Sequence, residues 1–402
     1  MKSLMKVFIM IVLSYLLVGC KSVSNYMNTT IMPTSKFLEK TDLGLLTFHQ
    51  SKHQESKRYF QEAVDIYRVW EDKPLVAFSD IAIIDYFGEG YDKVLLHNYS
   101  ALNYLMMGDI ESAKVETKNS NFIQKNERYK FYDKIEKFKD EKERYSTILT
   151  IYEQLFKSVN PTHNPYQNPF AYYVSALLYE EDNQYNDAYI DIKNALKYHK
   201  DSKILKDKLE LYKSNKQLDT QKRAELFFDI GKSPTKEQIK ISVKTDKNRE
   251  DMLYLPTFKL YKSKIDKIVI TDSFDEIIAE SYVLSDIDAI KINEFKRILP
   301  SLINRLVAES GKEVLIEALS QKSSSAGVLF KMLSTVYSQN NLQTWSSLPK
   351  KIEVISFIPK ESVNYRLKII DKDGKILNNK NLELNCIKKK KNCYQYYRII
   401  EN

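Results

Sequence analysis

The sequence predicts an α+β fold in which a region of helical repeats, residues 36–219, precedes a β-rich, sandwich-like region, residues 220–402. Two observations predict this fold. Up to about Leu218, apolar and aromatic residues recur three and four positions apart, the spacing of amphipathic helices. From about Thr220 onwards the apolar runs are short, rich in β-branched and aromatic residues, and bounded by Gly, Pro, Asn or Asp, as strands are.

The first twenty residues, MKSLMKVFIMIVLSYLLVGC, predict export and lipid attachment. Two lysines precede an apolar run, Val7–Val18, that is too short for an ordinary membrane span and fits the core of a signal peptide. The run leads into Leu-Val-Gly-Cys, which resembles the lipobox of bacterial lipoproteins, where cleavage precedes a cysteine that is then acylated. Residues 1–19 are therefore expected to be a lipoprotein signal peptide, with lipidation at Cys20. A plain signal peptide with a chance cysteine is the alternative.

Residues 20–35 are polar and irregular, which predicts a lipidated tether between the bilayer and the folded body. Lys21, not Asp, follows the cysteine. In Gram-negative lipoproteins this pattern resembles that of proteins sent on to the outer membrane, although sorting rules differ between bacteria and the inner membrane stays open. The expected location is the cell envelope, at the periplasmic face of the outer membrane, with the lipid bilayer bound through acylated Cys20.

The composition argues against nucleic acid as a partner. The formal net charge is +9, but 29% of the residues are charged and both signs are interspersed, which describes a solvated surface. Tyr is plentiful at 28 residues and Gly is rare at 9, a balance that suits packed helices with aromatic contacts.

A pattern in the helical region predicts a tight joint between two helices. Ala101, Tyr104, Gly108 and Ala113 resemble the tetratricopeptide repeat (TPR) pattern: a small residue and an aromatic on one helix, a Gly-Asp turn, and an Ala where the second helix crosses closest. Two helices approach closely only where the side chains are small, and Gly108 permits a positive φ in the turn.

The same pattern returns 75 residues further along, at Ala176, Tyr179 and Ala188, with Asn183 in the place of the turn glycine. Asn tolerates the left-handed conformation better than most residues. A weaker third copy is expected in ESKRYFQEAVDIYRVW, with Ala63 as the residue of closest approach. The charged stretch 126–157, between the two good copies, is expected to form a projecting helical hairpin or a capping segment.

The β-rich region contains short candidate strands and one helical stretch, residues 287 to about 337. Pro300 interrupts that stretch, which predicts two or more helices. The segment KDGK, residues 372–375, predicts a hairpin turn. The candidate strands are AELFFDI, QIKISV, KIDKIVIT, EIIAESYVL, KIEVISFI, VNYRLKIID and NLELNCI.

Cys386 and Cys393 flank a basic stretch that is expected to be a turn between two short strands. In an exported protein such a pair forms a disulfide or stays reduced, and both states are open here. A metal site is less favoured, because two cysteines without a nearby histidine supply too few ligands.

Four segments together resemble a family of uncharacterised Gram-negative lipoproteins with TPR-like repeats and a C-terminal β-rich domain. They are YDKVLLHNYSALNYLMMGDIESAKVE (91–116), NPFAYYVSALLYEEDNQYNDAYID (168–191), DIGKSPTKE (229–237) and TWSSLPKKI (344–352). The family usually has an acidic-basic run before its Trp, where this chain has NNLQTW. The resemblance implies an envelope location and a scaffold-like role, without an established reaction. Some members of that family are encoded beside activators of peptidoglycan synthases, which implies a setting in cell-envelope assembly or maintenance.

Motifs for catalysis or cofactors are weak. GKS at 231–233 lacks the preceding Gly of a phosphate-binding loop and is followed by Pro, and GEG at 88–90 lacks the third Gly of a dinucleotide site. His49 and His53 are four apart on a predicted helix, but the Glu of a zincin motif is Gln50, so solvated histidines are favoured over a metal pair. From the sequence we expect a protein that is not an enzyme and that has no cofactor and no metal site.

Glu116 is the polar residue singled out as a possible groove contact, because its offset from Ala113 places it near the inner face of its helix. An internal ion pair is the favoured alternative. Five tyrosines either line a groove or, by preference, fill the core between helices: Tyr99, Tyr104, Tyr172, Tyr173 and Tyr179.

The function expected from the sequence is a membrane-anchored periplasmic scaffold that binds an envelope protein through its helical repeats. The alternative is a peptidoglycan- or carbohydrate-active or -binding protein with its site in residues 220–402. Converging carboxylates in a cleft of that region favour the alternative, and an apolar-aromatic groove in residues 36–215 favours the scaffold.

Overall fold

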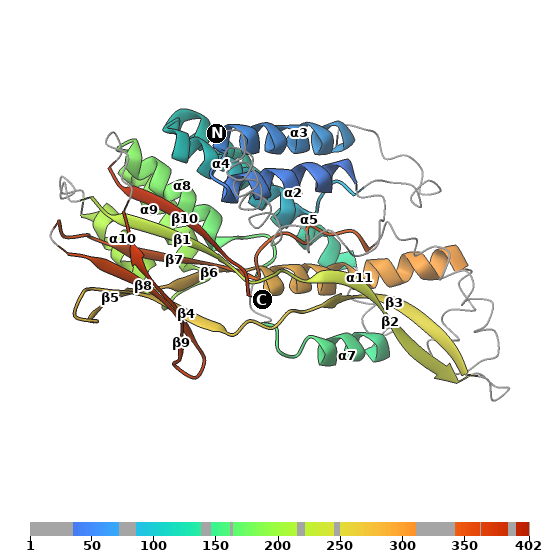
Figure 1. The fold of residues 1–402 in the computed structure, drawn as a ribbon. Coiled ribbons are helices and arrows are strands. Elements are labelled where there is room, and N and C mark those ends of the chain that lie inside the picture. Colours follow the sequence, from blue (N-terminus) through green and yellow to red (C-terminus); the bar gives the residue numbers. More distant parts are fainter. Residues whose placement is uncertain are drawn as a thin grey trace, which may run out of the picture. The chain divides into compact units, whose positions relative to one another are not determined.

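The computed structural model describes residues 35–71, 86–137, 146–160, 164–214, 222–244, 250–310, 342–361, 363–384 and 391–401. From Lys36 onwards the chain forms one compact unit, with helices in its N-terminal half and sheets in its C-terminal half (Figure 1). The described residues exclude the predicted signal peptide, Cys20 and most of the tether. Cleavage of the signal peptide and lipidation of Cys20 therefore stay predictions. None of the described helices is long and apolar enough to cross a membrane.

The helices of the N-terminal half pack in chain order. Each of α2, α3, α4 and α5 contacts the next, α5 contacts α8, and α8, α9 and α10 again contact in sequence. Short connections therefore join neighbours in space, as in a stack of helical hairpins. Their bounds are α2 (Lys36–His49), α3 (His53–Glu71), α4 (Gly90–Met107), α5 (Ile110–Lys137), α7 (Ser146–Leu155), α8 (Pro169–Glu181), α9 (Tyr185–Leu196) and α10 (Lys203–Lys213).

The two predicted joints share one turn geometry. At the end of α4 the Asp109 amide donates to the Tyr104 carbonyl at 2.9 Å, and Gly108 has φ 87°. At the end of α8 the Gln184 amide donates to the Tyr179 carbonyl at 2.8 Å, and Asn183 has φ 61°. Both are helix-ending turns that need one left-handed residue. The four alanines at the crossings, Ala101, Ala113, Ala176 and Ala188, are all fully buried.

A third joint with the same turn connects α2 and α3. The Lys52 amide donates to the Thr47 carbonyl at 2.9 Å, and Ser51 has φ 59°. Gly44 and Ser56 stand where the second hairpin has Ala101 and Ala113, and the Ser56 hydroxyl donates to the Gly44 carbonyl at 2.7 Å.

The prediction of Ala63 as the close-approach residue of this third copy was wrong. Ala63 is fully buried, but it lies seven residues beyond Ser56, the position that matches Ala113. The joint escaped the sequence pattern because Gly and Ser replace both alanines.

The C-terminal half contains two four-stranded sheets and a separate hairpin. The first sheet has the order β10-β1-β7-β6, with β10 parallel to β1 and the other pairs antiparallel. The second, β5-β4-β8-β9, is antiparallel, and β2 pairs with β3. The bounds are β1 (Ala224–Ile230), β2 (Thr235–Lys244), β3 (Glu250–Lys259), β4 (Ile265–Thr271), β5 (Ile277–Glu280), β6 (Tyr282–Asp286), β7 (Lys351–Phe357), β8 (Tyr365–Asp371), β9 (Ile376–Leu382) and β10 (Cys393–Ile399).

Strand β1 is buried on both faces. Leu226 and Phe228 belong to a core shared with β4 and β8 of the second sheet. Phe227, which points the other way, belongs to the core formed by the helices. Since side chains alternate along a strand, the first sheet is sandwiched between the second sheet and the helices. The helical and β-rich regions therefore share a core, and the change from helix to strand falls between Lys213 and Ala224.

Two local predictions for the β-rich region were wrong. Helix α11 (Ile287–Ser310) continues through Pro300, whereas an interruption was expected; residues 311–341 lie outside the described part. The strands beside the basic stretch were expected to form a hairpin, but β9 and β10 belong to different sheets. The KDGK turn is confirmed, since the Asp371 amide donates to the Lys375 carbonyl at 3.0 Å and Gly374 has φ 80°.

Candidate functional site

The face of the helices that was expected to form a groove is covered by the chain's own sheet. The Tyr99 hydroxyl of α4 donates to the buried Asp229 carboxylate of β1 at 2.8 Å. The Tyr173 hydroxyl of α8 donates to Glu225 of the same strand at 2.6 Å. Trp345, fully buried before β7, packs edge-on against Tyr99 with ring centres 6.3 Å apart. An open groove is therefore absent from this face in the part of the chain that the structure describes.

Glu116 forms the internal pair that was the favoured alternative. It is 8% exposed, and its Oε2 lies 2.5 Å from Nδ1 of the fully buried His97. Nε2 of His97 lies 2.6 Å from the Tyr67 hydroxyl of α3, so the three side chains link α3, α4 and α5. Of the tyrosines singled out in the sequence, Tyr99, Tyr172 and Tyr173 are buried in the core, and Tyr104 and Tyr179 pack partly buried against it.

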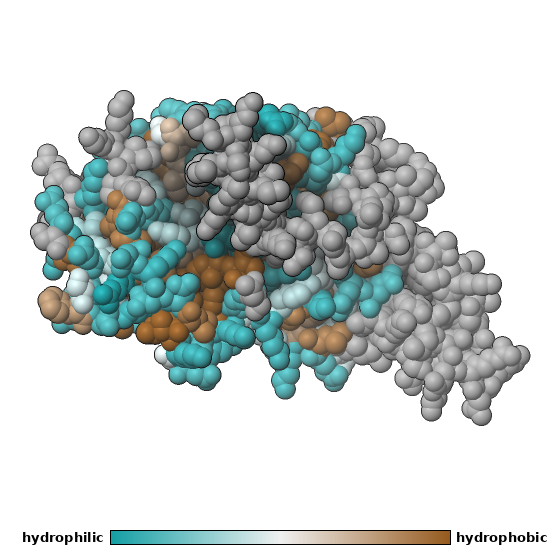
Figure 2. Space-filling model, viewed as in Figure 1, coloured by the Kyte–Doolittle hydropathy of each residue, from teal (hydrophilic) through white to brown (hydrophobic). Residues whose placement is uncertain are grey.

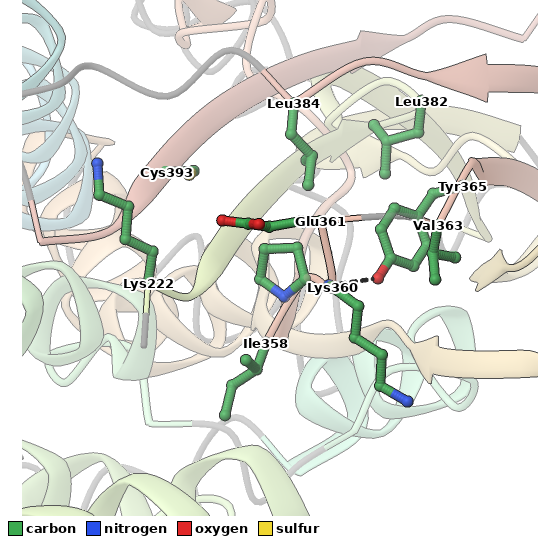
Figure 3. Close-up of a pocket in the computed structure, with 10 residues that line it drawn as sticks. Lys222, Ile358, Lys360, Glu361, Val363, Tyr365, Leu382, Leu384 and Cys393 are labelled. Carbon is green, nitrogen blue, oxygen red and sulfur yellow. Dashed lines mark hydrogen bonds between the residues drawn. The ribbon is translucent and has the colours of Figure 1, made fainter. Parts of the chain in front are cut away.

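One pocket lies at one end of the β-rich region, between the two sheets. Its volume is about 980 Å³, and its walls are largely apolar. Leu382, Leu384 and Tyr365 lie together on one side of the view and Lys222 on the other (Figure 3). The Lys360 amide donates to the Tyr365 hydroxyl at 2.7 Å, which holds that ring in the wall.

A second pocket, here called the histidine pocket, lies between the α2–α3 turn and strands β9 and β10. It has a volume of about 400 Å³ and is lined by both His49 and His53. The sequence placed the two histidines on one helix, but His49 ends α2 and His53 begins α3. Nε2 of His49 bonds to Asp229 at 2.9 Å, and Nδ1 of His53 bonds to Asn103 at 2.9 Å.

A third pocket of about 470 Å³ adjoins β6. Tyr282 and His199 form its aromatic corner, with the Tyr282 hydroxyl 3.0 Å from Nδ1 of His199. Each of the three pockets is lined by one carboxylate among the residues described, so the converging carboxylates that favour a glycan-cleaving enzyme do not line them.

Strongly perturbed acids gather under the sheet, away from these pockets. Burial raises the pKa values of Asp42, Asp92 and Asp288 to about 6 each. Burial also lowers the pKa of Lys291 to about 8, although the nearby carboxylates oppose that shift. The Lys291 ammonium donates to the Trp345 carbonyl at 2.7 Å. Perturbed pKa values occur at catalytic sites and in structural networks alike, and burial without a pocket favours the structural role.

Two of the segments that carry the family resemblance meet at this cluster. The Ser233 amide donates to the Leu348 carbonyl at 3.0 Å, and its hydroxyl accepts from Lys291 at 3.1 Å. The GKS motif therefore connects β1 to β2, and its serine bonds to other parts of the fold. A strand follows the motif, whereas a phosphate-binding loop requires a helix there.

The described residues also bear on metal binding and on the cysteines. No group of three or more His, Cys, Asp or Glu side chains suited to a metal occurs within the described ranges. Cys393 is disulfide-bonded. Cys386 lies outside the described residues, so its pairing with Cys393 stays a prediction.

A scan against protein-family models and a search of curated proteins each find no match to this chain. The functional argument therefore depends on the residues themselves.

Proposed function

We propose that this chain is a lipid-anchored envelope protein that acts as a protein-binding scaffold, with TPR-like hairpins whose outer surface receives the partner. The inner surface is occupied by the sheet, which leaves the second helix of each hairpin to face outward. Anchoring through Cys20 and an outer-membrane location remain part of this proposal, on the basis of the lipobox-like sequence.

The observation that carries the proposal is a pair of exposed residues that recurs in two hairpins. Val115 of α5 is 55% exposed and is followed at the i+3 position by exposed Lys118. Ile190 and Lys193 of α9, 75 residues further on, repeat the pair, and Ile190 is 53% exposed. Exposed apolar residues in single places are ordinary, but repetition at matching positions indicates a shared surface.

Helix α5 extends this surface by two turns. Phe122 is 64% exposed and lies seven residues after Val115, on the same side of the helix. Exposed Lys118 and Lys125 flank it. Apolar residues seven apart, each followed three positions later by a lysine, suit an amphipathic helix with acidic flanks. The expected partner is therefore an envelope protein that presents such a segment.

The edges of the second sheet offer a further contact surface. Ile277 and Ile278 on β5 and Ile376 and Leu377 on β9 are exposed at its two edges. Figure 2 shows apolar side chains gathered over the region of β4, β8 and β9 on the face in view. Exposed apolar edge strands favour pairing with another chain.

Photo-crosslinking in living cells tests the scaffold. Photoreactive residues at positions 122 and 190 are expected to capture the same envelope protein, while one at exposed Glu210 on α10 does not. The purified partner is then expected to bind through an acidic amphipathic segment, with affinity that falls as salt rises. Phe122→Glu should weaken this binding by about tenfold or more, the effect of losing an interface anchor. Equal capture from all three positions, or an affinity unchanged by Phe122→Glu, would contradict the proposal.

A further inference from the structure

Both imidazoles of the histidine pocket have a defined tautomer. Ser56 donates to the Gly44 carbonyl, so its oxygen accepts from the Asn103 amide nitrogen at 2.7 Å. The Asn103 oxygen therefore faces His53, whose Nδ1 must carry the hydrogen. In the neutral ring Nε2 then has a lone pair.

The same reasoning applies to His49. The Asp229 carboxylate is fully buried and accepts from the Tyr99 hydroxyl at 2.8 Å and the Tyr396 hydroxyl at 2.7 Å. It also accepts from Nε2 of His49, so Nδ1 has the lone pair in the neutral ring. Across the described residues, no hydrogen bond reaches the second nitrogen of His49 or His53, and both side chains line the pocket.

An aromatic ring that lines the same pocket as the two histidines, that of Tyr396, is held rigidly. Tyr396 is bonded to Asp229 through its hydroxyl, and its ring stacks on Phe227 with ring centres 5.6 Å apart. It also forms a T-shaped pair with Phe48, with ring centres 4.8 Å apart. It is half-buried and lines the pocket. The part of this ring that stays exposed in the pocket can contact the apolar side of a ligand without further loss of side-chain entropy.

The remaining lining groups mix hydrogen-bond donors and acceptors. Ser51, Asn381 and Lys380 can donate, and Glu383 accepts, in addition to the two imidazole nitrogens. The backbone is less available, because the Glu383 carbonyl already accepts from the Gln395 side chain at 2.7 Å. This disfavours an added peptide strand. Among the residues that the structure describes, no third ligand joins the two histidines, which disfavours a metal.

We propose that the histidine pocket binds a saccharide. A sugar ring has hydroxyls that both donate and accept, together with an apolar C–H face, and these match the mixed polar groups and the Tyr396 ring. The volume of about 400 Å³ lies within the range of small-ligand sites. The site is formed jointly by the helical and β-rich regions, and it does not depend on the scaffold surface of α5 and α9.

The test is binding of chitotetraose, a neutral N-acetylglucosamine oligomer, to the purified full chain by calorimetry. His49→Gln keeps a nitrogen that donates to Asp229, and His53→Asn keeps one that donates to Asn103, while each removes the lone-pair nitrogen. Each variant should bind about three- to tenfold more weakly, the effect of one lost hydrogen bond. His199→Gln in the β6 pocket is the matched control and should bind as the unchanged chain does.

Urea midpoints within error of the unchanged chain would show that the variants remain folded. No saturable binding of chitotetraose, or equal binding by His49→Gln, His53→Asn and the unchanged chain, would overturn the proposal. It would also be overturned if the pocket bound Zn²⁺ alone, or bound an extended peptide in place of the saccharide.

Discussion

At the residue scale, Gly44 is the tightest point of the first helical hairpin. A Cβ there would lie 2.4 Å from two atoms of the Phe60 ring, and Phe60 is fully buried. Gly44→Ala is therefore expected to lower the free energy of unfolding by about 1–3 kcal/mol, the cost of overpacking a core. Urea denaturation of the full chain measures it.

Gly108→Ala is the informative comparison, because the space around it is open and only the backbone opposes a side chain. No atom lies within 4 Å of the added Cβ, and φ is +87°. The expected loss is about 1–2 kcal/mol, from the left-handed conformation alone. If Gly44→Ala proved neutral while Gly108→Ala was costly, the close packing of α2 on Phe60 would be refuted.

These two glycines also show which helix joints can be predicted from residue types. Ala101, Gly108 and Ala113 belong to a recognisable pattern, and its copy at Ala176 and Ala188 could be found by spacing alone. The joint at Gly44 and Ser56 has the same turn, but its chemistry differs, with a hydroxyl bonded to a carbonyl in place of two methyl groups. A sequence pattern detects shared residues, and a shared backbone geometry with other residues escapes it.

At the element scale, a buried lysine links α10 to α8 and to the first sheet. Lys208 lies 2.8 Å from Glu180 of α8 and 2.8 Å from Glu225 of β1, and it is 2% exposed. Burial disfavours its charge, but the two carboxylates outweigh that effect and raise its pKa. Lys208→Met leaves both carboxylates without their cation, so it is expected to cost about 3–5 kcal/mol in unfolding free energy.

Lys213, on the same helix, provides the control for this prediction. Its pair with Glu210 is largely exposed, at 63% and 70%. Lys213→Met is expected to change stability by less than about 0.5 kcal/mol. A similarly small change for Lys208→Met, measured by the same denaturation, would mean that α10 is not tied to the sheet through this side chain.

The elements differ in how well the sequence predicts them. Alternation identified AELFFDI as a strand, and the structure confirms β1 there. The same alternation suggests that Glu225 and Asp229 face solvent, whereas both are fully buried beneath the helices. Their partners, such as Tyr99 and Tyr173, are far away in the sequence. Pairing of β1 with β10 likewise joins segments about 170 residues apart, which local periodicity cannot indicate.

At the scale of the whole molecule, burial of acids between helices and sheet should make stability depend on pH. Burial raises the pKa of Asp92 to about 6, and its Oδ1 has no hydrogen bond from any described residue. Folding therefore favours the protonated form of Asp92, relative to the unfolded chain. This contribution is fully present below the ordinary pKa of 3.8 and is lost as pH rises through about 6.

Asp92→Asn removes that dependence, because an amide does not ionise. The variant is expected to be more stable than the unchanged chain at a pH of about 7.5, by about 1–3 kcal/mol, and to match it at a pH of about 4. Urea denaturation at both pH values measures the difference. A variant that is less stable at the higher pH would show that the Asp92 charge is stabilised, contrary to this account.

At this scale, the sequence does not predict that the first sheet packs against the inner face of the helices. Periodicity indicates which face of each helix is apolar, and both a groove and a packed sheet satisfy an apolar face. Glu116 and the core tyrosines were ambiguous for that reason. The histidine pocket could not be predicted from the sequence either. It is formed where His49 and His53 lie near Tyr396, which is more than 300 residues away in the chain.

Hydrogen exchange of the full chain, followed by mass spectrometry, most directly tests the central claim that the helices and the first sheet form one unit. Peptides from α4 and β1 should exchange equally slowly and through one common opening, while the exposed strand β9 exchanges sooner. Fast exchange throughout α4 with β1 still protected would contradict the claim, since it would mean that the inner face of the helices is open and free to receive a partner.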